Sequence, residues 1–253
     1  MTTMEKLKLH KEEVLKYYPE DQLLGIFLYG SQNYKIDTET SDVDTKAILI
    51  PTFKELVFGR PVSRELHFEN REHCEVKDIR EIKKMFEKQN INFLEILFTD
   101  YCWVNPIYAD LWKKYFIDKA ELICHTNERQ AITSICEQAI HTLLQDKHDG
   151  KKYANGLRLY YTLKRYLNKI PYKRAINIET YSPELAKLLI QYKTGKKEFT
   201  EENVDDLIAK LMWLKSLAEQ YSAEPKKESL EALKEGVLAL INFNIDKQKE
   251  KIC

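Results

Sequence analysis

"LYGSQNYKIDTETSDVD" (residues 28–44) connects two short apolar runs of the chain. The first run, "LLGIFLY" (23–29), ends at Gly30, and the second, "VDTKAILI" (43–50), is rich in β-branched residues and ends at Pro51. Apolar runs of this length, bounded by glycine and proline, are typical of buried strands. The sequence therefore predicts two buried strands joined by a polar loop.

Elements on either side of this loop complete a predicted α/β region. Residues 4–18 form a candidate helix, and "RELHFEN" and "EHCEVK" form two candidate strands in a hairpin with its turn near Asn70. In "DIREIKKMFEK", Asp78 is followed three residues later by Glu81, which predicts a capping box that opens a helix. The segment "NINFLEILFTDYCW" (90–103) is predicted to be helix or turn.

The remainder of the chain is predicted to be helical. Ser182 and Pro183 have the residue types of an N-cap and a first helical position. We expect no strand after Asn105, and we expect helices over 106–123, 127–147, 151–168, 183–193, 201–221 and 226–247. The predicted fold is therefore α+β, with a short mixed sheet and flanking helices in residues 1–105 and an all-α domain in residues 106–253.

Two aspartates at the start of the second strand predict a cation site. Asp42 and Asp44 are two residues apart, so both carboxylates point to the same side of a strand. Adjacent carboxylates repel each other unless a positive charge lies between them, and hard oxygen ligands suit Mg²⁺ or Mn²⁺. A solvated turn with aspartates at the strand entry is the alternative.

Gly30 and Ser31 favour the cation site over the solvated turn. A glycine at the end of a strand lets the backbone turn sharply and approach a ligand, and backbone N–H groups with a serine hydroxyl can hold phosphate oxygens. Phosphate contacts at the end of one strand and carboxylates at the start of the next would suit a metal-bound triphosphate.

These residues resemble a known family motif. The pattern Gly30-Ser31 followed by Ser41-Asp42-x-Asp44 is similar to GSxxxGxxxxxSDxD of the DNA polymerase β-like nucleotidyltransferase superfamily. "KDIREIKKMFEKQNINFLEILFT" also resembles the helix and "NxNxLExLF" segment of a bacterial and phage subgroup of predicted nucleotidyltransferases. The resemblance covers residues 23–105 and is weaker in the helical half.

The resemblance implies an activity and roles for particular residues. Members transfer a nucleoside monophosphate from a nucleoside triphosphate, the donor, to an acceptor hydroxyl with release of pyrophosphate, using two metal ions. It implies that Asp42 and Asp44 bind Mg²⁺ or Mn²⁺ and that Gly30 and Ser31 hold the β- and γ-phosphates.

The superfamily also supplies a third metal-binding carboxylate from a neighbouring strand, and Glu72, Glu75 and Asp78 are the candidates. Strand alternation places Cys74 and Val76 in the core and Glu75 on the other face. Since Asp78 is expected to cap a helix, we predict that Glu75 is the third catalytic carboxylate and metal ligand.

Lys35 stands where the family motif has its second glycine. A lysine there could clash with a tight loop, which would put the activity in doubt. It could instead place an ammonium group beside the phosphates, and this is the prediction we adopt.

A basic segment in the helical half predicts further phosphate contacts. Residues 147–174 contain nine lysines or arginines and one acid, Asp149. On a helix over 151–167, an apolar face packs against the protein, and the opposite, basic face carries Lys151, Asn155, Arg158, Thr162 and Arg165. In related nucleotidyltransferases such a helix contacts the phosphates of the nucleotide. Arg158 is our first candidate and Lys152 our second.

Composition limits the class of protein but does not identify the acceptor. The chain has 253 residues and zero formal net charge, and its five cysteines are dispersed, which favours reduced thiols. No run approaches the roughly 20 apolar residues that span a bilayer, so we expect a cytoplasmic protein without membrane contact. The acceptor could be an RNA or tRNA end, a protein hydroxyl or a small molecule. The alternative function is a catalytically degenerate module of the same fold that binds a nucleotide or a protein.

Overall fold

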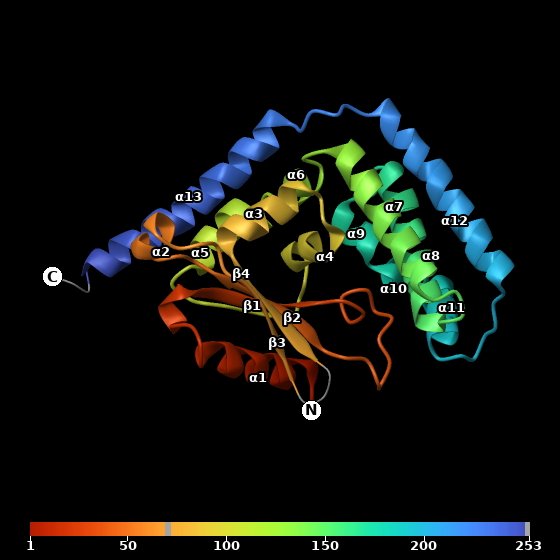
Figure 1. Cartoon of the computed structure of the whole chain (residues 1–253), viewed down its shortest axis with the longest axis horizontal. Coiled ribbons are helices and arrows are strands. Elements are labelled where there is room, and N and C mark those ends of the chain that lie inside the picture. The colour runs from red at the N-terminus through yellow and green to blue at the C-terminus, as the bar shows by residue number, and fades with distance from the viewer. Residues whose placement is uncertain (69–71, 251–253) are drawn as a thin grey trace.

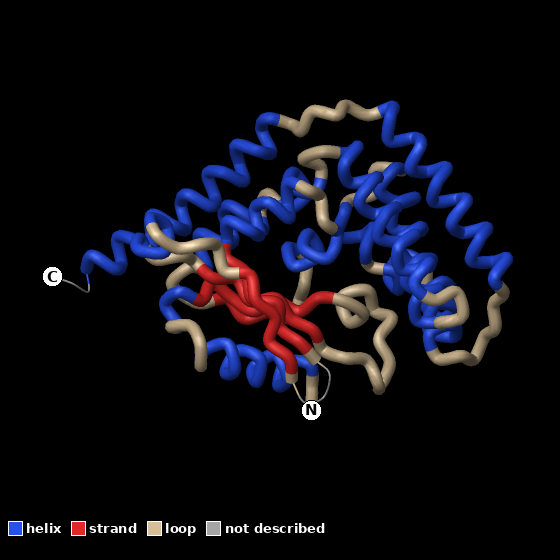
Figure 2. The backbone as a smooth tube through the Cα atoms, in the orientation of Figure 1, coloured by secondary structure: helices blue, strands red, loops and turns tan. Residues whose placement is uncertain are grey.

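The computed structural model describes residues 1–68 and 72–250, and these form one mixed sheet surrounded by helices (Figures 1 and 2). The strand order is β3-β4-β2-β1-β5, with β2 and β4 parallel and the other neighbouring pairs antiparallel. The strands are β1 (Leu23–Tyr29), β2 (Asp44–Leu49), β3 (Ser63–His67), β4 (His73–Asp78) and β5 (Cys102–Val104). The predicted α+β class is confirmed at this level, and the predicted turn near Asn70 lies outside the described residues.

Helices make up most of the described chain. Three 3₁₀ segments and one π segment join or extend them: η1 (Glu20–Gln22), η2 (Glu95–Leu97), η3 (Lys113–Ile117, the π segment) and η4 (Leu217–Gln220). The α-helices are α1 (Thr3–Leu15), α2 (Phe53–Val57), α3 (Ile79–Glu87), α4 (Ile91–Leu94), α5 (Ala109–Trp112), α6 (Ala120–Cys124), α7 (Glu128–Gln145), α8 (Gly150–Leu167), α9 (Tyr172–Ile176), α10 (Ile178–Tyr181), α11 (Pro183–Lys193), α12 (Glu201–Ser216) and α13 (Lys227–Glu250). Within the described ranges, none of these helices has both the length and the apolar character that crossing a bilayer requires.

Some element predictions were wrong at short segments. Residues 102–104 form the edge strand β5, which pairs with β1, where the sequence predicted helix or turn. The helix expected over 106–123 is interrupted by η3 and divided between α5 and α6. Asp78 caps α3 as predicted, but it accepts from the Arg80 N–H and no capping box with Glu81 forms, since the Glu81 carboxylate pairs with Lys84 instead. Segments of three to five residues are too short for periodicity to define them.

The sheet is covered on both faces, and this explains why β1 is apolar throughout. One face packs against α1 through a cluster that includes Leu7, Val14 and Ile26. The other face packs against a larger cluster that includes Phe27 and Ile48 and extends through α3 and α7 to α13. Figure 1 shows α1 on one side of the sheet and α3 and α13 on the other. The buried interior is therefore continuous across residue 105, and the predicted division into two domains there stays a prediction.

α13 brings the end of the described chain back to the sheet. Its Asn244 side chain is buried, donates to the Pro51 carbonyl (3.0 Å) and accepts from the Tyr108 hydroxyl (3.0 Å). The single proton of the Tyr108 hydroxyl is shared between this amide oxygen and the Asp21 carbonyl oxygen. The Asn244 amide therefore connects α13 directly to the segment that follows β2. Through Tyr108 it also connects α13 to the segment that precedes β1.

We expect Asn244→Ala to lower the free energy of unfolding by about 1 to 3 kcal/mol, because it leaves buried polar groups without a partner. Urea unfolding of the whole chain measures this. Asn242→Ala is the matched control, since Asn242 is exposed on the same helix. Equal midpoints for the two variants would contradict the role assigned to Asn244.

Candidate functional site

The loop between β1 and β2 begins with a tight turn that needs two left-handed residues. Gly30 has φ +98°, and Lys35 has φ +56°. The Ile36 N–H closes the turn by donating to the Ser31 carbonyl at 3.1 Å. Left-handed conformations cost a residue with a Cβ about 1 to 2 kcal/mol, so both positions favour glycine. Lys35 accepts the left-handed conformation without breaking the turn.

Asp44 is the first residue of β2, and Asp42 lies two residues before the strand. Val43 between them is buried, while the Asp42 and Asp44 side chains are 41% and 26% exposed. Asp44 Oδ1 is 2.8 Å from Nδ1 of His73 on β4. This hydrogen bond raises the pKa of His73, although burial opposes it. Asp42 Oδ2 is 3.6 Å from Nζ of Lys151 on α8.

Three cations from the helical half face this loop. Arg158 of α8 is 2% exposed, and its guanidinium stacks on the Tyr34 ring at 3.8 Å. Lys193, at the end of α11, donates through Nζ to Ser41 Oγ at 2.7 Å. Burial and the charge of Lys151 lower the pKa of Lys193. Two lysines whose charges act on each other beside this loop are suited to a polyanionic ligand.

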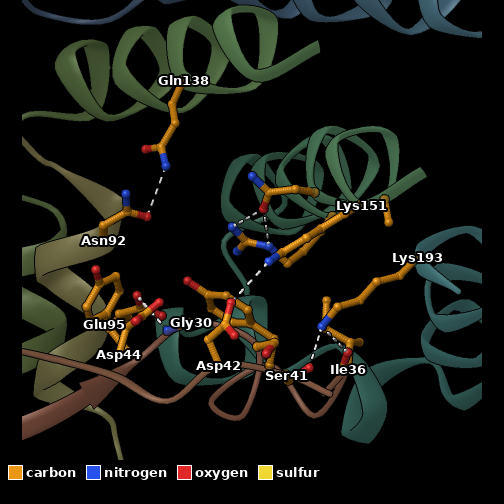
Figure 3. Close-up of a pocket in the computed structure, with 16 residues that line it drawn as sticks. Gly30, Ile36, Ser41, Asp42, Asp44, Asn92, Glu95, Gln138, Lys151 and Lys193 are labelled. Atoms are coloured by element: carbon orange, nitrogen blue, oxygen red, sulfur yellow. Dashed lines mark hydrogen bonds and ion pairs between the residues drawn. The ribbon is translucent and has the colours of Figure 1, made fainter. Parts of the chain in front are cut away.

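These groups line one cavity of about 220 Å³ between the sheet and the helices (Figure 3). Lys151 and Lys193 lie toward Asp42 and Ser41, and Asn92 lies with Gln138 on another side of the cavity. The lining residues are Tyr29, Gly30, Ser31, Tyr34, Ile36, Ser41, Asp42, Asp44, Asn92, Glu95, Gln138, Lys151, Ala154, Asn155, Arg158 and Lys193. We call this cavity the central pocket.

The "NxNxLE" part of the second motif supplies pocket residues to which the sequence analysis gave no role. Asn90 caps α4 by accepting from the Asn92 N–H at 3.1 Å. The Asn92 side chain accepts from Gln138 Nε2 at 2.9 Å. Glu95 is fully buried below the turn and accepts from the Gly30 N–H at 3.3 Å. The motif could have identified Asn92 and Glu95 as pocket residues. We recognise no sequence feature that would have identified Gln138 or Lys193.

Glu75 is where strand alternation put it, but it does not reach the central pocket. It pairs in register with Lys46 on the face of the sheet that carries Asp44. Its carboxylate is 2.6 Å from Nζ of the buried Lys46 and 3.0 Å from Nζ of Lys77. Burial alone would raise the pKa of Glu75, but the two ammonium groups outweigh burial and lower it. Glu75 is thus paired with two lysines, and its role as a third metal ligand stays a prediction.

Two predicted phosphate-binding lysines also lie elsewhere. The Lys35 ammonium lies 5.0 Å from the centre of the Tyr101 ring and lines a different, smaller cavity. Lys152 is one position out of phase on α8, since Lys151, Asn155 and Arg158 share the face that lines the central pocket. The basic face of α8 is not uniform either, because Arg165 is buried and stacks on Tyr181.

The residues at the turn are better suited to a metal ion that is held partly by phosphate oxygens than to a metal ion held by protein side chains alone. Within residues 1–68 and 72–250, no group of three or more His, Cys, Asp or Glu side chains is arranged to hold a metal ion. Asp42 and Asp44 provide two hard oxygen donors beside lysines that attract phosphate. Mg²⁺ is often held by one or two carboxylates together with substrate phosphates. The donor set is therefore compatible with Mg²⁺ or Mn²⁺ that arrives with a polyphosphate.

Comparison with known proteins does not assign the chain to a family. A scan against protein-family models gives no match, and a search of curated proteins gives none either. The resemblance to the polymerase β-like superfamily therefore depends on the two motifs in residues 23–105, and the activity that the resemblance implies is a proposal.

Proposed function

We propose that this chain is a metal-dependent nucleotidyltransferase of the DNA polymerase β-like superfamily. It would move a nucleoside monophosphate from a nucleoside triphosphate to an acceptor hydroxyl and release pyrophosphate. The observation that carries this proposal is that the Gly30-Ser31 turn, the aspartate pair and three cations line one cavity. A cavity with both carboxylates and cations is suited to a ligand that combines a divalent metal with phosphates.

The residues of the central pocket would have different roles in binding this ligand. Asp42 and Asp44 would hold Mg²⁺ or Mn²⁺, which supplies charge stabilisation to the phosphate oxygens when bound. Lys151, Lys193 and Arg158 would bind and orient the triphosphate. Gly30 shapes the turn, but its N–H already donates to Glu95.

Ser31 remains the phosphate contact that the resemblance implies. Its side chain lines the central pocket at the same turn. Its hydroxyl makes a long contact of 3.5 Å with Gln32, so it could exchange that contact for a phosphate oxygen. The acceptor would be an RNA or tRNA end, a protein hydroxyl or a small molecule.

A nucleotide-binding module without catalysis is the second candidate function. The neutralised state of Glu75 favours it, because a two-metal mechanism normally uses a third carboxylate. This module would bind a triphosphate through the same pocket but transfer nothing.

Incubation with α-³²P-labelled ribonucleoside triphosphates, Mg²⁺ or Mn²⁺ and cellular RNA, protein and small-molecule fractions distinguishes the two functions. The transferase should label one fraction, and the double variant Asp42→Ala, Asp44→Ala should not. Metal-dependent binding of the triphosphate without labelling of any fraction would favour the binding module. Absence of both binding and labelling would contradict both functions.

A further inference from the structure

His73 is the residue of β4 that lies beside Asp44. His73 begins β4 and Asp44 begins β2, and the parallel pairing of Thr45 with Cys74 places these two first residues next to each other. Alternate side chains of a strand share a face, so Glu75 lies on the same face as His73 but one pair further along the strands. On β4, His73 is therefore the residue whose side chain contacts Asp44.

One carboxylate oxygen of Asp44 receives two hydrogen bonds from His73. Asp44 Oδ1 accepts from the His73 backbone N–H at 3.2 Å and lies 2.8 Å from the imidazole Nδ1. In the described part of the chain, Asp44 Oδ2 takes part in no hydrogen bond or ion pair, and the side chain lines the central pocket. Two bonds to Oδ1 fix the rotation of the carboxylate and leave Oδ2 for a cation.

The imidazole of His73 is itself held at its other nitrogen. Nε2 is 2.5 Å from the hydroxyl of Tyr29, whereas Glu65 Oε1 is farther away, at 3.5 Å. A neutral imidazole satisfies the two shorter contacts together, because Nδ1–H donates to Asp44 while Nε2 accepts from the Tyr29 O–H. Tyr29, His73 and Asp44 thus form one hydrogen-bonded series across β1, β4 and β2.

We propose that His73 is a positioning residue that orients the Asp44 carboxylate for the divalent metal, and that Tyr29 fixes the imidazole in turn. This inference rests on the proposed function, in which Asp42 and Asp44 hold Mg²⁺ or Mn²⁺. A carboxylate that is already oriented loses less conformational freedom when it binds a cation. His73 acts through Asp44 and does not itself touch the metal or the nucleotide.

The test titrates Mn²⁺ into the full chain and follows equilibrium binding of an α-³²P-labelled ribonucleoside triphosphate, so it does not depend on transfer. His73→Leu should raise the Mn²⁺ concentration for half-maximal binding by about 10- to 100-fold, as is typical when a partner of a metal-binding carboxylate is lost. Binding in EDTA should match the wild type, because the cations of the pocket are unchanged. His73→Asn should restore much of the Mn²⁺ affinity, since its side-chain amide can donate from the position of Nδ1.

Two further variants separate positioning from a general effect on the sheet. His67→Leu is the matched control, because His67 pairs with His73 from β3 and is exposed. It should leave the Mn²⁺ requirement unchanged. Tyr29→Phe should raise the Mn²⁺ requirement less than His73→Leu does, and it should add nothing in the His73→Leu background, because both residues act through the same imidazole.

The assignment would be overturned by a His73→Leu variant with the Mn²⁺ requirement of the wild type, or by a His67→Leu variant with an equal rise. A His73→Asn variant as weak as His73→Leu would also contradict it. If His73→Leu does not fold, Tyr29→Phe decides, and a wild-type Mn²⁺ requirement in that variant would contradict the series. A wild type that binds no triphosphate in the presence of Mn²⁺ would instead refute the proposed function itself.

Discussion

Asp42→Asn and Asp44→Asn should each lower nucleotidyl transfer by about a thousandfold. A bound metal supplies several kcal/mol of transition-state stabilisation, and each 1.36 kcal/mol corresponds to a factor of ten in rate. Both side chains are partly exposed, so the substitutions should cost little stability. Initial rates of label transfer at saturating triphosphate measure the effect.

Asp37→Asn is the matched control for these two variants. Asp37 belongs to the same loop, but it is exposed and does not line the central pocket. Its transfer rate should stay close to that of the wild type. Equal loss in all three variants would mean that the loop, and not the aspartate pair, is sensitive to substitution.

Arg158→Leu should weaken triphosphate binding by about 100-fold. Arg158 Nη1 is buried and has no hydrogen-bond partner among the described residues, while the other side of the guanidinium is fixed by Asn155 and Tyr34. A phosphate oxygen would complete its hydrogen bonds, and such charge-assisted bonds contribute about 1.5 to 3 kcal/mol. Equilibrium binding with Mg²⁺ measures the loss.

Arg165→Leu provides the control for Arg158→Leu. Arg165 is on the same helix, is buried and stacks on a tyrosine, but it does not line the central pocket. Arg165→Leu should lower the free energy of unfolding without lowering the affinity for the triphosphate. Similar losses of affinity in the two variants would show that α8 acts through packing, and that Arg158 does not contact phosphate.

Much of the sheet could be predicted because its strands carry strong local patterns. The run over 23–29 is β1 itself, and the alternation of Cys74 and Glu75 correctly separated the two faces of β4. β5 could not be predicted, because three residues at a sheet edge show no period. Its pairing with β1 is a tertiary interaction.

The site was predictable where neighbouring residues form it and unpredictable where distant ones do. Asp44 begins β2 and Asp42 lies two residues before the strand, so both belong to one short stretch of sequence, and Arg158 follows from the helical phase of Lys151. Lys193 contacts Ser41 across 152 positions of sequence, which no local pattern reveals. Glu75 was predicted as the third ligand from strand alternation, and no local pattern shows that Lys46 pairs with it.

The most direct test of the central pocket is the binding of a labelled ribonucleoside triphosphate with Mg²⁺ and with EDTA. The wild type should bind one triphosphate per chain, and removal of the metal should weaken this binding strongly. The double variant Asp42→Asn, Asp44→Asn should lose the metal-dependent part of triphosphate binding, and Asp37→Asn should keep it. A wild type that does not bind, or a double variant that binds as tightly as the wild type with Mg²⁺, would contradict a metal-triphosphate site at residues 28–44.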